Sequence, residues 1–600
     1  MMALLLHLPL LLPSKNQSFL KSSSSKSFQV LQRIPYLFPT TCLSYAGVHE
    51  TSASSPARRT ANFQPTIWDD DHIQSLPIDF MEDKYVKLRE KLKEEVRCMI
   101  GKQYGLIDQL EFVDVLRQLG VAYHFDSEIK DLLNSFNSSE KIINSLIETN
   151  NLHHTSLMFR LLREHVIDAS ILSADILMSG FRSKIESLNI NHEHDVKGML
   201  SLYEASFHAV EGEDELDDSG DFATKYLRNL DKSLIDQQLI EEIDHALELP
   251  LHWRMPRLHT RWYIDVYKRQ ENMNPILLEF AKLDFNMMQC FYKQELKEMS
   301  RWWINLGLIC DELSFARDRL VENYLWSSGF NFRPEFWRCR KAVTKINCFV
   351  TTLDDIYDIY GTMDELELFT NVVQGWKISA SEELPNYMKI CLTALFKTMD
   401  EIANDFSMEK GLNILPCLKR MWGDLCKAFL VEARWYHTGY TPTLNEYLEN
   451  AWISISGTCE LTAAYCLSNE LTIEALNNLE FYPPIVRSSC MLARLYNDLV
   501  TEKEEMKRGD APKSIQCFMN ENNVCELEAE DYIKILVRKY WKELNGMRYR
   551  GTKYMKCFQE AVVDVPRMAQ CMYQFGDGHS KPNQETKDRV IMLLMEPISP

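Results

Sequence analysis

Three carboxylates interrupt an apolar segment in the second half of the sequence. Asp354, Asp355 and Asp358 lie in the run LDDIYDIYG, among residues that favour burial. Carboxylates are rarely buried unless they are paired or bind a metal. On an α-helix Asp354 and Asp358 share one face, where their like charges repel unless a cation lies between them. The segment therefore predicts a cation site, with Asp355 about a quarter-turn away and expected to support the other two.

A second segment carries three more oxygen ligands at helical spacing. In ARLYNDLVTEKEE, Asn497, Thr501 and Glu505 are each four residues apart, so they lie on one helical face. Carboxylate, amide and hydroxyl oxygens suit a hard cation such as Mg²⁺ or Mn²⁺. Charged helix faces are common, and this one alone would be modest evidence. Two oxygen-bearing faces in one part of the chain are a more specific signal for a metal site.

A metal of this kind points to a phosphate-bearing substrate. Mg²⁺ in proteins usually shares its coordination shell with water and substrate phosphates, and guanidinium groups match phosphate oxygens in geometry. Candidate cationic partners are Arg317, Arg319, Arg494 and Lys513. The sequence has no GxxxxGK[ST] loop and no GxGxxG element, which argues against a nucleotide. The remaining class of substrate is an organic molecule with a diphosphate leaving group.

The elements that must position these residues are helices. The chain has 600 residues, of which 46% are hydrophobic and only 21 are glycine. Apolar residues recur at helical spacing in 83–100, 141–151 and 195–210, which predicts amphipathic helices joined by short turns. Pro275 is expected to begin a helix at a domain boundary, after which the helices become richer in aromatic residues. The pattern predicts an all-α protein.

Charge and cysteine usage exclude several classes of protein. A net charge of −20 argues against a non-specific nucleic-acid binder, and no segment after the first 57 residues is long and apolar enough to cross a membrane. Sixteen cysteines without a CxxC pair predict reduced core thiols rather than a zinc site. The acidic run at 211–221 is expected to be a solvated loop between two helices, and HEH at 192–194 an exposed loop.

The first 57 residues differ from the rest of the chain. They are rich in serine, contain four basic residues and have a single acid, Glu50. This composition is typical of an organelle transit peptide, and we predict import into the plastid stroma. The leucine-rich start also resembles a secretory signal, which stays open as an alternative, although no basic residue precedes it.

Taken together, the motifs resemble those of the plant terpene synthases, especially the angiosperm monoterpene synthases. The resemblance rests on DDIYD, the Asn-Asp-x-x-Thr-x-x-x-Glu pattern, RDR at 317–319, and RRTANFQPTIW, and it runs from Arg58 to the C-terminus. It implies a transit peptide at 1–57, an N-terminal α-barrel domain at 58–273 and a catalytic domain of the class I terpenoid synthase fold at 274–600. No DxDD motif is present, so ionisation by protonation in the N-terminal domain is not expected.

The resemblance also implies roles for individual residues. Three Mg²⁺ or Mn²⁺ ions are expected on Asp354, Asp355, Asp358, Asn497, Thr501 and Glu505. The substrate diphosphate is expected to contact Arg317, Arg494 and Lys513 together with Asp354, Asp358 and Asn497, with Arg319 in the same catalytic set. Trp326, Asn347 and Tyr573 are expected in the pocket wall, and Arg58, Arg59 and Trp68 in a segment that caps the closed site.

The implied reaction is the metal-dependent ionisation of geranyl diphosphate to an olefin or alcohol, acyclic or cyclic, with release of diphosphate. Isoprene synthases narrow the pocket with two phenylalanines where this chain has Asn347 and Ala493, which favours a ten-carbon substrate. Phe575 stands where limonene-forming relatives carry histidine, and SISGTC at 454–459 resembles a helix break that faces the cation. Two alternatives stay open, a sesquiterpene synthase acting on farnesyl diphosphate and a non-catalytic helical scaffold. The protein is expected to be a monomer or weak homodimer, without nucleic-acid or membrane partners.

Overall fold

The computed structural model describes residues 58–102, 105–149, 151–167, 193–477, 479, 481–550 and 554–599. These residues belong to one compact unit, Arg58–Pro600. Its described part contains helices and turns and no β-strand, which confirms the all-α prediction there. The predicted transit peptide at 1–57 lies outside the described residues.

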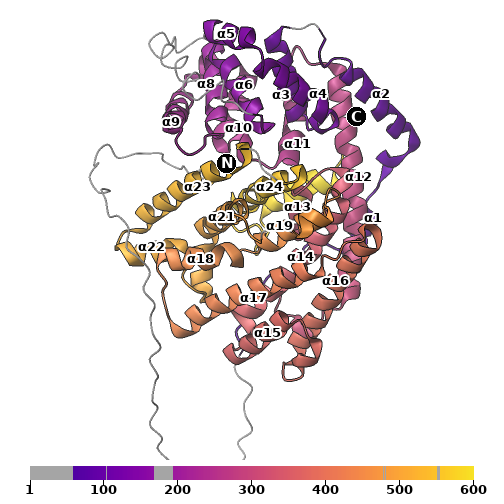
Figure 1. The fold of residues 1–600 in the computed structure, drawn as a ribbon, viewed down its shortest axis with the longest axis vertical. Helices are drawn as coiled ribbons and strands as arrows, with labels where there is room; N and C mark the ends of the chain where they lie inside the picture. Colours follow the sequence, from indigo (N-terminus) through magenta and orange to yellow (C-terminus); the bar gives the residue numbers. More distant parts are fainter. Residues whose placement is uncertain are drawn as a thin grey trace, which may run out of the picture. The chain divides into compact units, whose positions relative to one another are not determined.

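The first half of the unit consists of short helices, drawn in indigo to magenta in Figure 1. They are α1 (Asp70–Ser75), η1 (Asp79–Met81), α2 (Asp83–Arg97), α3 (Leu106–Gln118), η2 (Ala122–Phe125), α4 (Asp126–Asn137), α5 (Glu140–Thr149), α6 (Leu152–Glu164), α8 (Glu193–Ser206), α9 (Asp214–Arg228), η4 (Lys232–Leu234), α10 (Gln237–Glu248), η5 (Leu251–Trp253) and α11 (Pro256–Tyr267). Helix α8 packs between α6 and α9. The three periodic segments at 83–100, 141–151 and 195–210 all form helices, as predicted.

The second half begins with longer helices and carries the predicted metal motifs. Its elements are α12 (Pro275–Leu306), η6 (Asp311–Leu313), α13 (Leu320–Gly329), η7 (Pro334–Phe336), α14 (Trp337–Asp355), η8 (Ile356–Tyr360), α15 (Met363–Gly375), η9 (Ile378–Ser381), α16 (Asn386–Lys410), α17 (Leu415–Thr438), α18 (Leu444–Ser454), α19 (Gly457–Cys466), α20 (Ile473–Asn477), α21 (Pro484–Arg508), α22 (Ser514–Asn522), α23 (Glu526–Tyr549), α24 (Lys556–Tyr573), α25 (Gln584–Val590) and η10 (Ile591–Met595). Helix α19 packs on both α14 and α21, the two helices that carry the motifs.

Helix α12 connects the two halves and starts where the sequence predicts. Pro275 is its first residue, and the side-chain oxygen of Asn274 accepts hydrogen bonds from the N–H groups of Ile276 (2.9 Å) and Leu277 (3.4 Å). Proline at the first position lacks only an N–H that the helix would leave unpaired, so the cap and the proline agree. The elements α1, η1 and α2 pack on α12, which ties the N-terminal segment to the second half.

Two loop predictions are wrong. The acidic run at 211–221 forms the start of α9, with Asp214, Glu215 and Asp217 in its first turn. The unpaired N–H groups and the positive end of the helix dipole favour carboxylates there, an effect that a count of like charges overlooks. Lys542 of α23 also pairs with Asp214 at 3.3 Å. In HEH, residues 193 and 194 open α8 instead of lying in a loop, and residue 192 lies outside the described residues.

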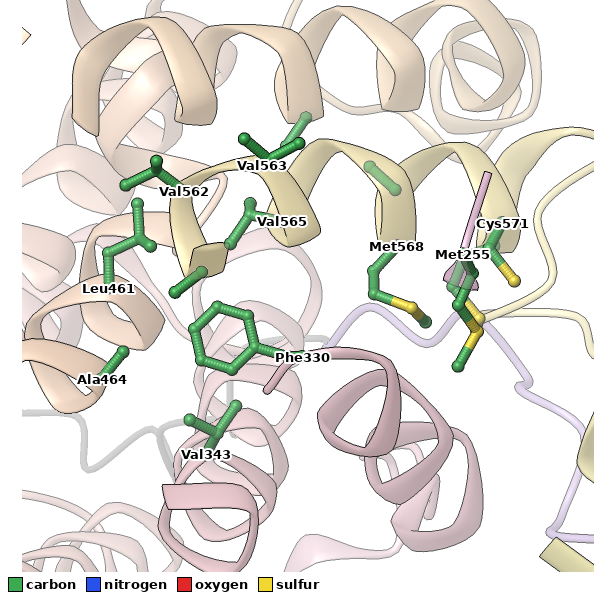
Figure 2. Close-up of a cluster of buried hydrophobic side chains, with 14 of the residues drawn as sticks. Met255, Phe330, Val343, Leu461, Ala464, Val562, Val563, Val565, Met568 and Cys571 are labelled. Carbon is green, nitrogen blue, oxygen red and sulfur yellow. The ribbon is translucent and has the colours of Figure 1, made fainter. Parts of the chain in front are cut away.

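The helices bury one extensive apolar core. Figure 2 shows part of it, where α24 lies over Phe330 and Val343, with Leu461 and Ala464 of α19 alongside. Burying a side chain of this size contributes roughly 1.5–3 kcal/mol. All described cysteines are free thiols and most are buried, as predicted. None of the described helices has the length and apolar character needed to cross a membrane.

Candidate active site

The DDIYD segment lies where the helix changes type. Helix α14 ends at Asp355 and continues as the π-helix η8, a rare conformation that is frequent at functional sites. Asp354 and Asp358 therefore lie on either side of the transition. Burial raises the pKa of Asp358 well above its usual range, and the neighbouring charges of Asp510 and Asp354 raise it further. A cation between these carboxylates would relieve that repulsion.

The second oxygen-bearing face lies on α21, as the spacing predicts. The residue Thr501 is 1% exposed, and its hydroxyl oxygen has no hydrogen-bond partner among the described residues. The Asn497 side-chain oxygen accepts a hydrogen bond from Nη1 of Arg494 at 3.0 Å. Oε2 of Glu505 lies 4.0 Å from Nζ of Lys513. The three predicted ligands thus occupy a largely buried face beside two of the predicted cationic residues.

Lys513 lies between the two acidic segments. Its Nζ is 3.0 Å from Oε2 of Glu432 and 3.5 Å from Oδ2 of Asp510. The positive charge of Lys513 also opposes the rise in the pKa of Asp358. Burial lowers the pKa of Lys513, but the charges of Asp510, Glu432 and Glu505 outweigh it and raise the pKa well above its usual range. Lys513 is therefore a permanent positive charge in the site.

Arg317 closes the opposite side of the site. Its backbone N–H and its Nε donate to Oδ2 of Asp355 at 2.7 and 3.1 Å, its Nη1 donates to Oγ of Ser580 at 2.7 Å, and its Nη2 pairs with Asp354. Burial raises the pKa of Asp355 to about 6, against the effect of the Arg317 charge. Asp355 therefore orients Arg317, which agrees with its position away from the face of Asp354 and Asp358.

Arg319 has a different environment from Arg317. Its guanidinium donates to the backbone carbonyls of Gln64 (2.9 Å), His579 (2.9 Å) and Ser580 (3.0 Å). These contacts fasten the N-terminal segment and the loop after α24 to the start of α13. The structure does not bring the Arg319 side chain into contact with the predicted metal ligands.

The tandem arginines reach both motif segments. Arg58 pairs with Glu365, with Nη2 2.7 Å from Oε1, and its Nη1 donates to the carbonyl of Tyr360 at 3.1 Å. Arg59 donates from Nη1 to the carbonyl of Asp358 at 2.9 Å and from Nη2 to that of Gly509. One short segment thus contacts the end of η8 and the C-terminal cap of α21.

The rest of this N-terminal segment is anchored at further points. The guanidinium of Arg59 lies over the ring of Tyr436, at 4.3 Å from its centroid, and that of Arg317 lies over the ring of Phe63 at 4.8 Å. Further along, Nε1 of Trp68 donates to Oε1 of Glu322 at 2.9 Å. We call residues 58–68 the N-terminal strap.

The predicted pocket residues meet around a buried glutamate. Nε1 of Trp326 donates to Oε2 of Glu460 at 3.0 Å, and Asn347 also hydrogen-bonds to this carboxyl group. Tyr573, the last residue of α24, lies near the charges of Asp577 and Glu505. The structure therefore brings Trp326 and Asn347 together and places Tyr573 beside the α21 face.

The helix break in SISGTC is present. Ser456 has φ of 68°, a left-handed conformation that is uncommon for a residue other than glycine, and α19 starts directly after it. A Cβ at Gly457 would lie 2.9 Å from Sγ of Cys490 on α21, so a larger residue there would force one of the two helices or the Cys490 side chain to shift. Phe575, in contrast, is 45% exposed, with the guanidinium of Arg589 over its ring.

Comparisons with known proteins agree with this geometry. A family described as "Terpene synthase, N-terminal domain" matches residues 67–247, and "Terpene synthase family, metal binding domain" matches residues 305–543. "Terpene synthase 10" of Ricinus communis is 48% identical over 543 residues, which cover 90% of this chain and 98% of that protein. The chain belongs to the terpene synthase family.

Other relatives of this terpene synthase have more specific names. The "(-)-alpha-terpineol synthase" of Vitis vinifera is 48% identical over 90% of this chain and 91% of its own length. A limonene synthase with 2-fluorolinalyl diphosphate superposes with a TM-score of 0.83 at 38% identity, covering 90% of this chain and 100% of that one. Isoprene synthase from grey poplar, in complex with three Mg²⁺ ions and dimethylallyl-S-thiolodiphosphate, gives a TM-score of 0.80 at 40% identity, covering 89% and 99%. The family and its metal-binding domain identify a class I, divalent-metal-dependent lyase, which removes the scaffold alternative.

The donor set of this terpene synthase fits a divalent metal. No group of three His, Cys, Asp or Glu side chains in the described part of the chain is arranged to hold a metal by itself. The predicted set, however, also uses amide and hydroxyl oxygens. The unpartnered hydroxyl of Thr501 and the raised pKa of Asp358 are what an oxygen site for a hard cation would leave without its ion.

Three residues of the site were missed by sequence reasoning. Glu460 is 3% exposed, and burial raises its pKa to about 7. His579 lies in the loop after α24, with Nε2 2.9 Å from Oδ1 of Asn323, and burial together with Arg317 lowers its pKa to about 3. Glu432, on α17, is the buried counter-ion of Lys513. Only Glu460 had a local signal, as the lone charge in the apolar run TCELTAAYC.

Proposed function

We propose that this terpene synthase ionises geranyl diphosphate and converts it to a monoterpene, an olefin or an alcohol, acyclic or cyclic, with release of diphosphate. The observation that carries the proposal is that each oxygen-bearing face has a buried cation beside it, Arg317 at Asp354 on α14 and Arg494 and Lys513 at α21. Arg59 bridges the two segments through the carbonyls of Asp358 and Gly509. Relatives named for ten-carbon products, among them terpineol and myrcene synthases, support this substrate.

The proposal also includes the number and the identity of the metal ions. Three Mg²⁺ or Mn²⁺ ions would be held by Asp354 and Asp358 from one face and by Asn497, Thr501 and Glu505 from the other. The complex of isoprene synthase with three Mg²⁺ ions supports the count. When bound, such ions act as Lewis acids that stabilise the negative charge on a departing diphosphate.

The protein's own cations add to this stabilisation. Arg317, Arg494 and Lys513 are buried and permanently charged, since nearby carboxylates raise the pKa of each above its usual range. Fixed charges in a water-poor site stabilise developing charge more strongly than they would in water. They therefore favour breakage of the C–O bond, in which the electron pair leaves with the diphosphate oxygen and an allylic cation remains.

The allylic cation requires a dry pocket and then a base. The N-terminal strap would exclude water, and the aromatic faces of Trp326 and Tyr573 would stabilise the cation by about 2 kcal/mol each once desolvated. An olefin forms when a C–H proton is lost. Glu460 and the neutral imidazole of His579 are the candidate acceptors, because their pKa values of about 7 and about 3 leave unprotonated forms at neutral pH.

Domain limits, location and assembly complete the proposal. The proposed N-terminal domain spans 58–273 and the catalytic domain 274–600, and the family matches at 67–247 and 305–543 fall within them. Residues 1–57 are proposed to direct import into plastids, in line with relatives named as chloroplastic.

We propose that the protein is a monomer or a weak homodimer. No observation favours farnesyl diphosphate as a substrate.

The proposal is tested by removing one metal ligand. Asp354→Ala is expected to lower kcat with geranyl diphosphate and Mg²⁺ by about 10²-fold or more, the scale for removing one group that stabilises developing charge. Products are measured by gas chromatography. Asp364→Ala is the matched control, because Asp364 is exposed in the first turn of α15. Full activity in Asp354→Ala, or equal losses in both variants, contradicts the proposal.

A further inference from the structure

A cavity of about 460 Å³ lies apart from the active site, between the N-terminal helices and the second half of the unit. Its walls come from the end of α3, η2, α4, η5 and α11 on one side, and from residues 331–336, α23 and α24 on the other. None of the residues assigned above to metal, diphosphate or pocket lines it. Neither the family match nor the proposed reaction gives this space a function.

The wall of the cavity is strongly cationic. Eight of the lining residues are arginine or lysine and four are aspartate or glutamate. The cationic residues are Arg117, Lys130, Arg254, Arg257, Arg333, Arg548, Lys556 and Arg567. The acids are already paired within the wall. Glu164 pairs with Arg117 at 2.5 Å, Asp564 with Arg567 at 3.1 Å, and Asp126 and Glu560 both pair with Arg333, at 2.9 and 3.0 Å. Two acids outside the wall also face these cations, Glu248 at 3.1 Å from Arg254 and Asp284 at 3.5 Å from Arg257. Six acids therefore face eight cations, and a smaller excess of positive charge remains.

Two of these guanidinium groups are buried with donors unused. Arg257 is 1% exposed; its Nη1 contacts the carbonyl of Gly120 at 3.3 Å and Oδ2 of Asp284 at 3.5 Å, while its Nε and Nη2 have no partner among the described residues. Arg548 is 7% exposed, and its Nε likewise has no partner in the described part of the chain. A buried charged donor without a partner lowers the stability of the folded protein by about 1–3 kcal/mol or more. A ligand that accepts these hydrogen bonds would therefore bind favourably.

The pKa values of two arginines in the wall also favour the binding of an anion. Burial lowers the pKa of Arg567, and the positive charge of Arg548 lowers it further. Burial likewise lowers the pKa of Arg117. An anion in the cavity would reverse these effects, since an opposite charge favours the protonated guanidinium.

We propose that this cavity is a binding site for a phosphate-bearing anion of the size of inorganic diphosphate or a small organic phosphate. Guanidinium groups approach from several directions and match an anion with many oxygens better than a halide or a single carboxylate. The cavity is also large enough for more than one phosphoryl group. The exposed side chains of Lys130 and Lys556 lie at its wall and would attract an anion from solution.

The site would join the two halves of the unit. Arg257 belongs to α11, whereas Arg548 and Arg567 belong to α23 and α24, so one anion would bridge helices from both halves. Helix α24 contributes to both the cavity and the core: Val563 lines the cavity, and Val563, Val565 and Met568 all belong to the apolar cluster drawn in Figure 2. Binding is therefore expected to stabilise the folded protein without entering the active site.

The test measures binding in the absence of divalent metals. With EDTA present, titration of the purified protein with inorganic diphosphate is expected to give saturable heat in calorimetry and to raise the unfolding midpoint by several degrees. Inorganic phosphate and glycerol phosphate, in separate arms, distinguish a simple phosphate from an organic phosphate as the preferred ligand. KCl at equal ionic strength is the reference, and an equal rise with KCl overturns the proposal.

Variants locate the binding. Arg548→Gln is expected to weaken binding about tenfold or more, and Lys556→Gln, at an exposed position where folding is not at risk, to weaken it less. Arg434→Gln, an exposed arginine elsewhere that pairs with Glu367, is the matched control and is expected to leave affinity unchanged. Loss of binding in Arg317→Gln instead would place the anion in the active site and overturn the proposal, as would affinities unchanged in Arg548→Gln and Lys556→Gln.

Discussion

At the scale of single residues, the active site contains buried charges that are stabilised by neighbouring groups of opposite charge. Asp355 is buried but faces Arg317, and Lys513 is buried among Glu432, Asp510 and Glu505. Glu460 is different, because its described partners are the neutral side chains of Trp326 and Asn347. A buried carboxyl with neutral partners resists ionisation, which makes its protonation state dependent on pH near neutrality.

The titration of Glu460 should be visible in the pH dependence of the free energy of unfolding. Burial raises its pKa from 4.5 to about 7, so the native state binds more protons than the unfolded state between these values. Its contribution is therefore fully present below about pH 4.5 and is lost as pH rises through 7, by on the order of 3 kcal/mol at 1.36 kcal/mol per unit. Glu460→Gln keeps a hydrogen-bond acceptor for Trp326 and is expected to remove this loss.

The measurement compares urea unfolding of the two proteins at pH 5 and pH 8. Other buried acids titrate in both proteins, so the difference between them isolates this carboxyl group. Glu470→Gln, at an exposed position ten residues further along the chain, should behave like the wild type. Parallel pH curves for the wild type and Glu460→Gln would mean that the carboxyl group does not titrate as described.

Sequence reasoning at this scale was strongest where ligands repeat along one helix. Asp354, Asp358, Asn497 and Thr501 were predicted because spacing alone puts them on shared faces. Two other buried polar residues were not predicted, because Glu432 on α17, the partner of Lys513, and His579 after α24, the partner of Asn323, reach the site only through packing of segments distant in sequence. Such contacts leave no trace in local periodicity.

At the scale of elements, the N-terminal strap connects the ends of the two motif segments. Arg59 contacts the carbonyls of Asp358 on η8 and Gly509 at the end of α21, and its guanidinium stacks on Tyr436. Carbonyl oxygens at helix ends lack partners within the helix, so an arginine there satisfies them and also interacts with the negative end of the dipole. The strap therefore links the segments that carry the proposed metal ligands.

Removing the Arg59 side chain should loosen the N-terminal strap and admit water to the active site. Arg59→Ala is expected to lower kcat by about tenfold or more, and to raise the fraction of alcohols formed by water capture, because closure excludes solvent from a reactive intermediate. Gas chromatography measures both rate and product ratio in one assay. Arg269→Ala, which removes an exposed ion pair with Glu241, is the control. An unchanged product ratio with an unchanged rate would argue against a closing function for the strap.

Most helices were predictable from apolar spacing, but two features of the elements were not. The π-helix at 356–360, which packs against α14 and α17, is a conformation that apolar spacing does not predict. The start of α9 depends on carboxylates that pair with Lys542 of α23, far away in the sequence. The π-helix was not predicted, and the loop prediction at 211–221 was wrong because it overlooked both the helix dipole and these contacts with α23.

At the scale of the whole unit, the two halves share buried polar contacts. The sequence predicts a domain boundary near Pro275, and the residues on both sides of it belong to one compact unit, Arg58–Pro600. Part of the reason is Asn545 on α23, which is 1% exposed. Its Nδ2 donates to the carbonyls of Phe207 (2.9 Å) and Ala209 (3.1 Å), and its Oδ1 lies 2.9 Å from Nε2 of His252. The stacked rings of Trp253 and Trp541 lie beside this contact.

Asn545→Ala should therefore weaken the unit as a whole while leaving the chemistry intact. Two buried carbonyls and an imidazole would lose their partner, which is expected to cost about 2–3 kcal/mol and to lower the thermal midpoint by several degrees. The kcat of the folded protein should be unchanged, because no active-site residue contacts Asn545 in the described structure. Asn522→Ala, which removes an exposed side-chain contact with the carbonyl of Phe518, is the matched control for differential scanning calorimetry. If the halves unfold independently, Asn545→Ala will leave the midpoint unchanged, and the bridging role of this side chain will be excluded.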